Sequence, residues 1–321
     1  MTGPEIVPFT REHLEGAAEL LAARHRRHRE AEPLLSARYE DPAVAREEVA
    51  AAYGLLDASG SAAVEGSRVV GYLLGAPKSG SPWGDNIWVE SSGHAVEAAE
   101  TARGLYALAA TRWVAEGRVA HYALLPAHDR ELVDAWFRLA FGHQHTHGIR
   151  EPAAAGPVRA GLTVRQPVRA EIPVLARLDM VLTEHQSLSP TFSGGPPDVY
   201  EERVADWEED FDNPKFWNVV VEHDGSIAGS AVGCALEVSS AHVGPARPDH
   251  AGFLGFAAVL PGARGLGVGR ALGEAVTAWA LEAGFTSVVT DWRETNLLSS
   301  RAWRGVGYRD TFTRVHRLVG H

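Results

Sequence analysis

Residues 259–270 read VLPGARGLGVGR and lead from an apolar strand through a glycine-rich turn into a helix. The amides in the first turn of a helix have no intrahelical acceptor, so they attract an anion that lies near their N–H groups. Glycines let the backbone approach such an anion closely. The stretch therefore predicts a binding site for a phosphate group, although an ordinary tight turn between a strand and a helix could use the same glycines.

The residues around this turn predict an α/β domain. Apolar residues recur every three or four positions from Val268 onward, which indicates one buried face of a helix, and Gly284 follows as its expected C-terminal cap. Asn296 is expected to cap a last short helix that ends before Gly305 and Gly307. The expected strands of this half are residues 219–222, 227–235, 253–260 and 288–290, and the first two flank a turn at residues 223–225.

A second stretch, NLLSSRAWRGVGY at residues 296–308, adds to the glycine-rich turn. Arg264, Gly267 and Gly269 resemble the [QR]-x-x-G-x-[GA] acyl-CoA motif of the GNAT superfamily of acetyltransferases. Asn296 and Tyr308 resemble the family's second signature, an Asn followed twelve residues later by the aromatic residue of a Gly-aromatic pair. The resemblance covers residues 162–321, and the layout of the whole chain is similar to that of tandem members such as mycothiol synthase.

The resemblance implies two tandem GNAT-like domains of α/β fold, each with a mixed, mostly antiparallel, splayed sheet flanked by helices. It also implies an N-acetyltransferase in which the amine of a small-molecule acceptor attacks acetyl-CoA directly in a ternary complex, while backbone amides stabilise the oxyanion. The acetyl-CoA contacts that it implies are Ala258, Val259, Leu260, Arg264, Gly265, Leu266, Gly267, Val268, Gly269, Arg270, Asn296, Ser299 and Trp303.

Proton transfer is where the chain departs from this family. Many members place a Tyr seven residues after the Asn as a general acid, but Trp303 occupies that position and cannot donate a proton in this role. The candidate general bases are Glu237, His250 and Asp291, which lie near strand ends that border the splayed region. The more common role for each of them is that of a solvated residue at a strand end. Cys234 is expected to be a small core residue rather than a nucleophile.

The charge of the chain bears on its partners. The formal net charge is −11, which argues against nucleic-acid binding because an acidic surface repels phosphates. Residues 198–212, DVYEERVADWEEDFD, are expected to form the second helix of the second half, which borders the acceptor site in the family. This stretch is either a solvated helix face or a feature that attracts a cationic amine.

The length of 321 residues predicts two domains. Residues 151–161, EPAAAGPVRAG, have the composition of a linker. Three pairs of segments match in the same order on either side of it, which indicates a duplication. The matches are residues 6–14 with 163–172, Gly71 and Gly75 with Gly229 and Gly233, and residues 135–141 with 302–308.

The two halves differ at the glycine-rich turn. In the first half, its expected position reads ESSGHAV at residues 90–96 and lacks the motif. We therefore expect residues 1–150 to form a degenerate, non-catalytic GNAT-like domain and residues 151–161 to link it to a catalytic domain at 162–321 that binds acetyl-CoA.

Other features narrow the expected location and cofactors. The chain has no apolar run of the roughly 20 residues that cross a bilayer, so no membrane contact is expected. It has one cysteine and no basic-apolar leader, which suits a cytoplasmic protein. His143, His145 and His147 are expected on a strand surface, and since no fourth ligand is evident, no metal is expected. The oligomeric state, monomer or homodimer, stays open.

Two other functions compete with acetyl transfer. One is an acyl-CoA-binding or partner-binding module that has lost catalysis, which the missing Tyr keeps open. The other is an NAD-dependent oxidoreductase, because Gly265 and Gly267 open a helix and Asp291 ends the next strand. The dehydrogenase interpretation is weaker, because Arg270 replaces the third glycine and too few strands follow the motif.

Overall fold

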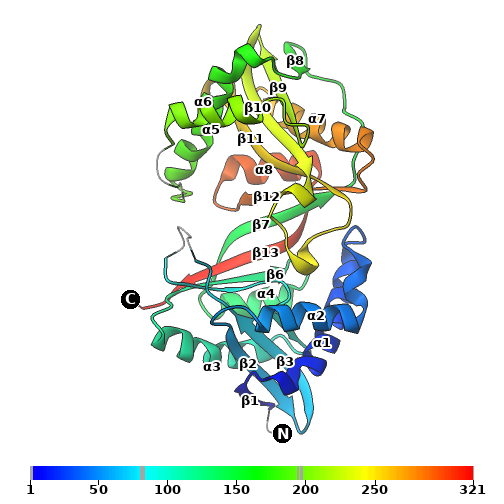
Figure 1. Ribbon diagram of the computed structural model, residues 1–321, viewed down its shortest axis with the longest axis vertical. Coiled ribbons are helices and arrows are strands. Elements are labelled where there is room, and N and C mark those ends of the chain that lie inside the picture. Colours follow the sequence, from blue (N-terminus) through cyan, green and yellow to red (C-terminus); the bar gives the residue numbers. More distant parts are fainter. Residues whose placement is uncertain (1–2, 80–83, 194, 196–197, 321) are drawn as a thin grey trace. The chain divides into compact units, whose positions relative to one another are not determined.

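The chain divides into two structural units in a computed structural model that describes residues 3–79, 84–193, 195 and 198–320 (Figure 1). Unit 1 consists of residues 1–146, 242–248 and 310–321, and unit 2 consists of residues 147–241 and 249–309. None of the helices in the described ranges is both long and apolar enough to cross a membrane.

Unit 2 is built on a mixed sheet with the strand order β12-β11-β10-β9-β8. β12 runs parallel to β11, and the other neighbouring pairs are antiparallel. Gly229 and Gly233 of β10 face α7, whereas Val232 and Cys234 face the cavity beside α5 and α6. Because successive side chains of a strand point to opposite faces, these helices cover opposite faces of the sheet. The elements are β8 (Leu162–Arg165), α5 (Ile172–Ser187), α6 (Tyr200–Asp210), β9 (Phe216–His223), β10 (Ser226–Ala235), β11 (Ala251–Val259), α7 (Val268–Glu282), β12 (Ser287–Arg293) and α8 (Leu297–Val306).

Unit 1 is likewise built from paired strands and helices. Its strands form the antiparallel order β1-β2-β3-β5 and the order β4-β6-β13, in which β4 is parallel to β6. The elements are β1 (Glu5–Pro8), α1 (Leu14–Ala31), α2 (Pro42–Tyr53), β2 (Ser59–Glu65), β3 (Arg68–Gly75), β4 (Asn86–Val89), β5 (His94–Val96), α3 (Thr101–Ala115), β6 (Ala120–Pro126), α4 (Arg130–Phe137), β7 (Gly142–Arg150), which the unit boundary divides after Thr146, and β13 (Arg309–Leu318). Short 3-10 helices span Arg11–His13, Ala37–Glu40, Arg169–Glu171, Leu236–Val238, Gly244–Ala246 and Pro261–Ala263.

The packing of matched glycines confirms that the two halves are tandem copies of one fold. A Cβ atom on Gly75 of β3 would lie 2.9 Å from the ring of Trp113 in α3. A Cβ atom on Gly233 of β10 would also lie 2.9 Å from a tryptophan ring, that of Trp279 in α7. In both units a strand glycine therefore makes room for a Trp of the helix that packs on it.

The units differ from the expected domain ranges because the last strand of the second half belongs to unit 1. Residues 312–318 of β13 pair antiparallel with residues 120–126 of β6. Phe312 is fully buried and packs with Leu35, Leu124 and Ala246. Pairing with β6 and burial of Phe312 thus place residues 310–321, together with residues 242–248, in unit 1.

Two local expectations also need correction. α8 runs through Gly305 and ends at Val306, and Gly307 caps it at φ +103°, a left-handed conformation that suits glycine. His145 and His147 lie on a strand as expected, but both are buried instead of lying on its surface. Within the described ranges, no cluster of three or more His, Cys, Asp or Glu side chains is arranged to hold a metal ion.

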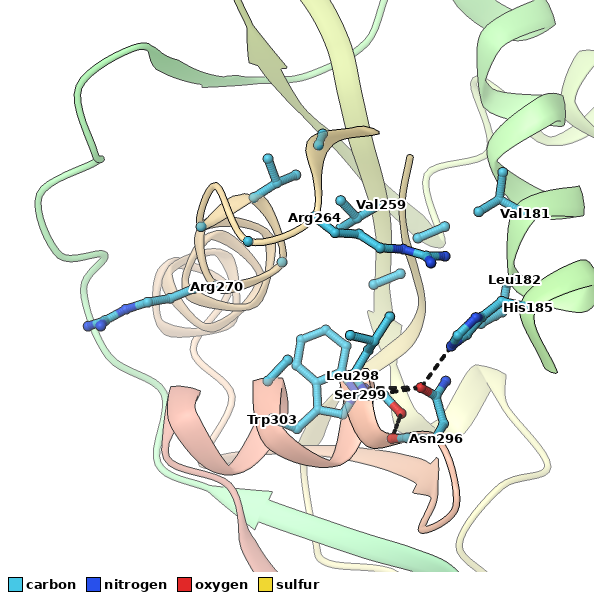
Figure 2. A pocket seen from close by; sticks show the side chains of 18 residues that line it. Val181, Leu182, His185, Val259, Arg264, Arg270, Asn296, Leu298, Ser299 and Trp303 are labelled. Carbon is cyan, nitrogen blue, oxygen red and sulfur yellow. Dashed lines mark hydrogen bonds between the residues drawn. The ribbon is translucent and has the colours of Figure 1, made fainter. Parts of the chain in front are cut away.

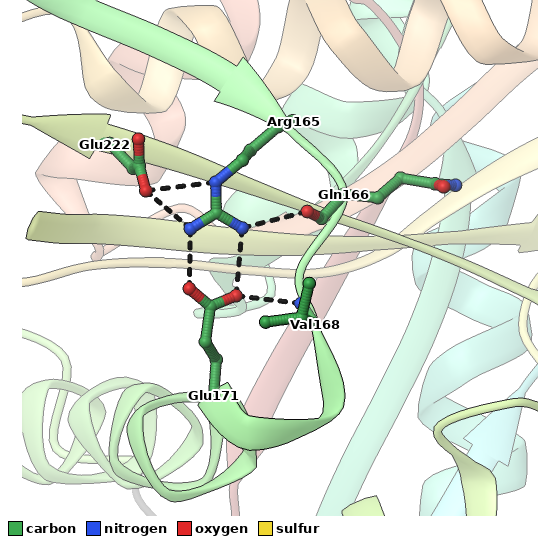
Figure 3. A network of polar contacts seen from close by, with 5 residues as sticks. All are labelled: Arg165, Gln166, Val168, Glu171 and Glu222. Atoms are coloured by element: carbon green, nitrogen blue, oxygen red, sulfur yellow. Dashed lines mark hydrogen bonds and ion pairs between the residues drawn. The ribbon is translucent and has the colours of Figure 1, made fainter. Parts of the chain in front are cut away.

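A polar network fixes the start of unit 2 (Figure 3). Arg165 of β8 donates to both carboxylate oxygens of Glu171, at 2.6 and 2.9 Å, and its Nε donates to Glu222 of β9 at 3.0 Å. Glu171 also accepts the amide of Val168 at 2.8 Å. Because Glu171 directly precedes α5, the network joins the N-terminal end of this helix to the edge of the sheet.

Candidate active site

The first turn of α7 has backbone amides that donate to no backbone carbonyl of the described residues and so are available to a ligand. Gly267 is the N-cap residue at φ +93°, and it has no side chain that could cap the helix. No backbone carbonyl in the described chain accepts from the amides of Val268, Gly269 or Arg270; the first bond of the helix is Ala271 N–H to Gly267 O at 3.0 Å. α8 differs, because Asn296 Oδ1 accepts from the amides of Leu298 and Ser299. The start of α7 can therefore donate several hydrogen bonds to an anion.

The sheet opens beside these amides. β11 and β12 pair only at residues 251–253 and 287–289, whereas β11 stays paired with β10 as far as Val259. Gly255 has no partner in β10, because the register shifts between Val232 and Gly233. This is a β-bulge, and it coincides with the point where β11 leaves β12.

The open edge of β11 also carries backbone amides. The amide of Leu260 donates to Ala228 O at 2.9 Å and so points toward β10. Because amides alternate in direction along a strand, those of Val259 and Ala257 point to the opposite side, where the sheet is open. Both residues line the cavity there.

This first cavity has a volume of about 350 Å³. Figure 2 shows Arg264 reaching toward α5 across the cavity, with Trp303 on the opposite wall. The lining residues are Val181, Leu182, His185, Ala257, Ala258, Val259, Ala263, Arg264, Gly265, Gly267, Val268, Gly269, Arg270, Asn296, Leu298, Ser299, Ala302 and Trp303.

The cavity gathers most of the acetyl-CoA contacts expected from the sequence. Leu260 and Leu266 are not among its lining residues. The side chain of Arg270 points away from the cavity (Figure 2) and donates to Glu274 at 2.7 Å. Arg270 can therefore contribute its backbone amide, while Arg264 is the arginine whose side chain faces the cavity.

Asn296 serves the structure and also faces the cavity. Its Oδ1 caps α8 and lies 3.2 Å from Nε2 of His185 in α5. Because an amide oxygen only accepts, Nε2 of His185 is the donor in this bond. The serines beside Asn296 differ in position, since Ser299 lines the cavity and Ser300 is buried outside it.

The positions of Trp303 and Tyr308 show whether either could act as a general acid at the cavity. Trp303 is buried, lines the cavity and packs against Gly273 of α7. Tyr308 is also buried, does not line the cavity, and burial raises the pKa of its hydroxyl above the ordinary value. Tyr308 therefore does not substitute for the Tyr that Trp303 replaces.

A second cavity, of about 500 Å³, lies on the face of the sheet covered by α5 and α6. Its lining residues are Asp179, Leu182, Thr183, Asp198, Arg203, Trp207, Phe216, Val232, Cys234, Val238, Ser239, Phe253, Gly255 and Phe256. Burial, followed by the charge of Glu237, raises the pKa of the Cys234 thiol, which disfavours the thiolate that a nucleophile needs.

The structure does not bring the three candidate bases together. Glu237 is exposed in the 3-10 helix after β10. His250 is also exposed and directly precedes β11, whereas Val259 is the last residue of that strand. Asp291 is half-buried on β12, two residues past the last one paired with β11, and so lies where the sheet opens. Among the described residues that line the two cavities, none is Glu237, His250 or Asp291.

Sequence reasoning missed Asp179 and His185, which line the second and the first cavity. Asp179 lies four positions after Leu175 and three before Leu182, on the apolar face of α5. The sequence signal that could have identified Asp179 is a carboxylate within the apolar face of a helix, because burying a charge is unfavourable unless the charge is paired or has a functional role.

The corresponding turn of unit 1 lies later than expected. Val96 pairs with Gly71 as Val259 pairs with Gly229, so the turn that corresponds to residues 260–267 is residues 97–100, EAAE, instead of 90–96. The amides of Thr101, Ala102 and Arg103 donate to carbonyls of this turn at 3.0–3.1 Å. The start of α3 thus has occupied donors and two nearby glutamates, both unfavourable for a phosphate.

Backbone carbonyls of residues 90–96 also accept hydrogen bonds from within unit 1. The buried Arg24 of α1 donates to the carbonyls of Ser91 and His94, and Tyr72 donates to that of Ser92 at 2.7 Å. Burial lowers the pKa of Arg24 to about 10. The polar groups of this turn are therefore satisfied within unit 1.

Residues 181–308 match the model of the acetyltransferase (GNAT) family. No curated protein sequence matches the chain. A GCN5-related N-acetyltransferase from Sphaerobacter thermophilus has a similar structure, with a TM-score of 0.56 and 16% identity, covering 99% of this chain and 97% of that one. A tandem GNAT protein from the clavulanic acid biosynthesis pathway gives a TM-score of 0.48 at 18% identity and 99% coverage of both chains. At these identities the likeness concerns the fold alone.

Proposed function

Since residues 181–308 match the model of the GNAT family, we propose that this chain is a member of that family and transfers an acetyl group from acetyl-CoA to the amine of a small-molecule acceptor. The observation that carries the proposal is the set of unpaired amides at the start of α7, next to the cavity where β11 leaves β12. A helix start with free donors suits a pyrophosphate, and an open strand edge suits the amide-containing pantetheine arm.

The residues of the first cavity divide into three roles under this proposal. The amides of Val268, Gly269 and Arg270 bind the pyrophosphate, and the guanidinium of Arg264 adds positive charge beside it. The backbone of β11 at residues 257–259 pairs with the pantetheine arm. Trp303 and Asn296 form the wall along α8.

We propose that unit 2 alone binds acetyl-CoA, and that unit 1 is a non-catalytic copy. The donors at the start of α3 are already bonded, and Glu97 and Glu100 would repel a pyrophosphate. These features support one binding site per chain.

A second candidate function is a module that binds acyl-CoA without transferring the acetyl group. Trp303 lines the cavity where many family members have an acidic Tyr, and Tyr308 is buried outside the cavity, so neither residue can serve as the general acid. The lack of this acid favours a binding module. An NAD-dependent oxidoreductase is a weaker alternative, because Arg270 stands where a third glycine is needed and, in the part of the chain that the structure describes, β12 and β13 are the only strands after α7.

Titration calorimetry with acetyl-CoA and, separately, with NAD tests these functions. We expect one acetyl-CoA per chain and no heat of binding with NAD. Two equivalent acetyl-CoA sites would contradict the assignment to unit 2, and binding of NAD alone would contradict acetyl transfer. Release of CoA thiol in the presence of an amine then separates an enzyme from a binding module.

A further inference from the structure

The second cavity adjoins the first where the sheet opens. Leu182 of α5 lines both cavities. Along β11, Gly255 and Phe256 line the second cavity and the next residue, Ala257, lines the first. A molecule in the second cavity would therefore approach the open edge of β11 from the side opposite α7.

The charge of the second cavity favours a cation. Asp179 and Asp198 line it, and Asp206 and Asp210 line a smaller adjoining cavity that Asp179 also borders. Arg203 is the only Lys or Arg among the described residues that line these two cavities, and its Nη2 lies 2.9 Å from Asp206. Four carboxylates against one paired guanidinium leave an excess of negative charge.

Aromatic rings cover the remaining wall. Trp207, Phe216, Phe253 and Phe256 line the second cavity. The faces of such rings attract an ammonium group, and their area suits the apolar body of a ligand. A carboxylate on the ligand would be unfavourable beside Asp179 and Asp198.

Asp179 is held in a defined position within this cavity. Its Oδ2 accepts a hydrogen bond from Nε1 of Trp207 at 2.7 Å. Burial raises the pKa of Asp179 to about 6, while the bond from Trp207 and the charge of Arg203 act in the opposite direction and Asp198 and Asp206 raise it further. A carboxylate with such a pKa is a better proton acceptor near neutral pH than an exposed one.

We propose that the second cavity binds the acceptor as a primary ammonium ion on an apolar or aromatic body without a carboxylate, and that Asp179 accepts its proton. The proposal rests on the proposed function, because it assigns the acceptor side of the same reaction. It also moves the role of base away from Glu237, His250 and Asp291.

The proposed step balances in atoms and charge. One proton of the ammonium passes to the Asp179 carboxylate and then to solvent. The amine nitrogen forms a bond to the thioester carbonyl carbon, and the carbon–sulfur bond breaks. The second proton of nitrogen ends on the CoA sulfur, directly or through water, and the third remains on the amide product.

The first test measures acetyl transfer to 2-phenylethylamine, with phenylalanine as its carboxylate-bearing match. We expect transfer to 2-phenylethylamine and at least a tenfold lower kcat/KM for phenylalanine. A wild-type protein that does not bind acetyl-CoA contradicts the proposed function itself. If it binds acetyl-CoA and transfers to neither amine, or prefers phenylalanine, the acceptor class is wrong while the proposed function stands.

The second test compares D179N with D212N, which removes an equal charge from an exposed ion pair with Arg169 outside both cavities. For D179N we expect kcat/KM to fall about 100-fold, and for D212N no change beyond twofold. Acetyl-CoA affinity, measured by calorimetry, should be unchanged in both variants, which shows that the fold is intact. D179N activity within twofold of the wild type would overturn the role of Asp179.

A third variant, W207F, separates proton transfer from a structural role. It removes the hydrogen bond that lowers the pKa of Asp179, so the acidic limb of the kcat/KM profile should move to higher pH. An acidic limb at the wild-type position would contradict the assignment of that limb to Asp179.

Discussion

Replacing Gly267 with Val tests the proposed pyrophosphate site most directly. Gly267 lies at φ +93°, where a side chain is strained, but an added Cβ would meet no atom closer than 3.7 Å. The strain costs about 1–2 kcal/mol, which corresponds to a fall in Tm of a few degrees. The fold should therefore survive.

The loss in binding should be larger than the loss in stability. Gly267 is the N-cap residue in a left-handed conformation, so we expect a valine there to relieve its strain by moving the turn, which would misalign the amides of Val268 and Gly269. Hydrogen bonds to a charged group are worth about 1.5–3 kcal/mol each, so loss of two costs about 3 kcal/mol or more. A loss of about 3 kcal/mol corresponds to a roughly 150-fold increase in Kd for acetyl-CoA.

Titration calorimetry gives the affinity, and thermal unfolding gives the stability. The matched control is Gly262→Ala in the same turn, where an added Cβ has no neighbour within 4 Å and the residue does not line the cavity. The control should bind acetyl-CoA like the wild type. A folded Gly267→Val variant with unchanged affinity would refute the pyrophosphate assignment.

Trp303→Phe should keep most of the activity, whereas Trp303→Ala should lose acetyl-CoA affinity and about 3 kcal/mol of stability, because the buried ring fills space against α7; calorimetry and denaturant unfolding measure the two. Because we expect no essential acid, the rate should rise with pH and then level off, and a steep alkaline fall at constant acetyl-CoA affinity would point to an acid such as Ser299. Hydrogen bonds from Arg165 lower the pKa of Glu171, so their stabilising contribution is present above the unfolded pKa of about 4.3 and is lost as the pH falls through the folded value. The Tm should accordingly drop toward pH 3 in the wild type and drop less in Arg165→Met, and equal drops would show that this pair does not contribute.

The elements next to the glycine-rich turn followed from the sequence, and their ends differed by a few residues. The helix that begins at Val268 and the cap at Asn296 depend on residues within a few positions of each other, so local patterns were sufficient. The expected end of α8 was wrong, because a glycine inside a short helix does not by itself end it. A helix interior tolerates Gly305 at a cost of about 1 kcal/mol relative to Ala.

The sequence by itself determined the duplicated fold and the glycine-rich turn before α7, because repeated spacings and a run of glycines are local properties of the chain. Only the tertiary structure decided that the donors of α3 are bonded while those of α7 are not, since strand pairing sets which residues form each turn. The same holds for the pairing of β13 with β6 and for the place of Asp179 beside Trp207. The contacts of β13 with β6 and of Asp179 with Trp207 join residues 28 or more positions apart, so their free energy depends on packing that no local pattern records.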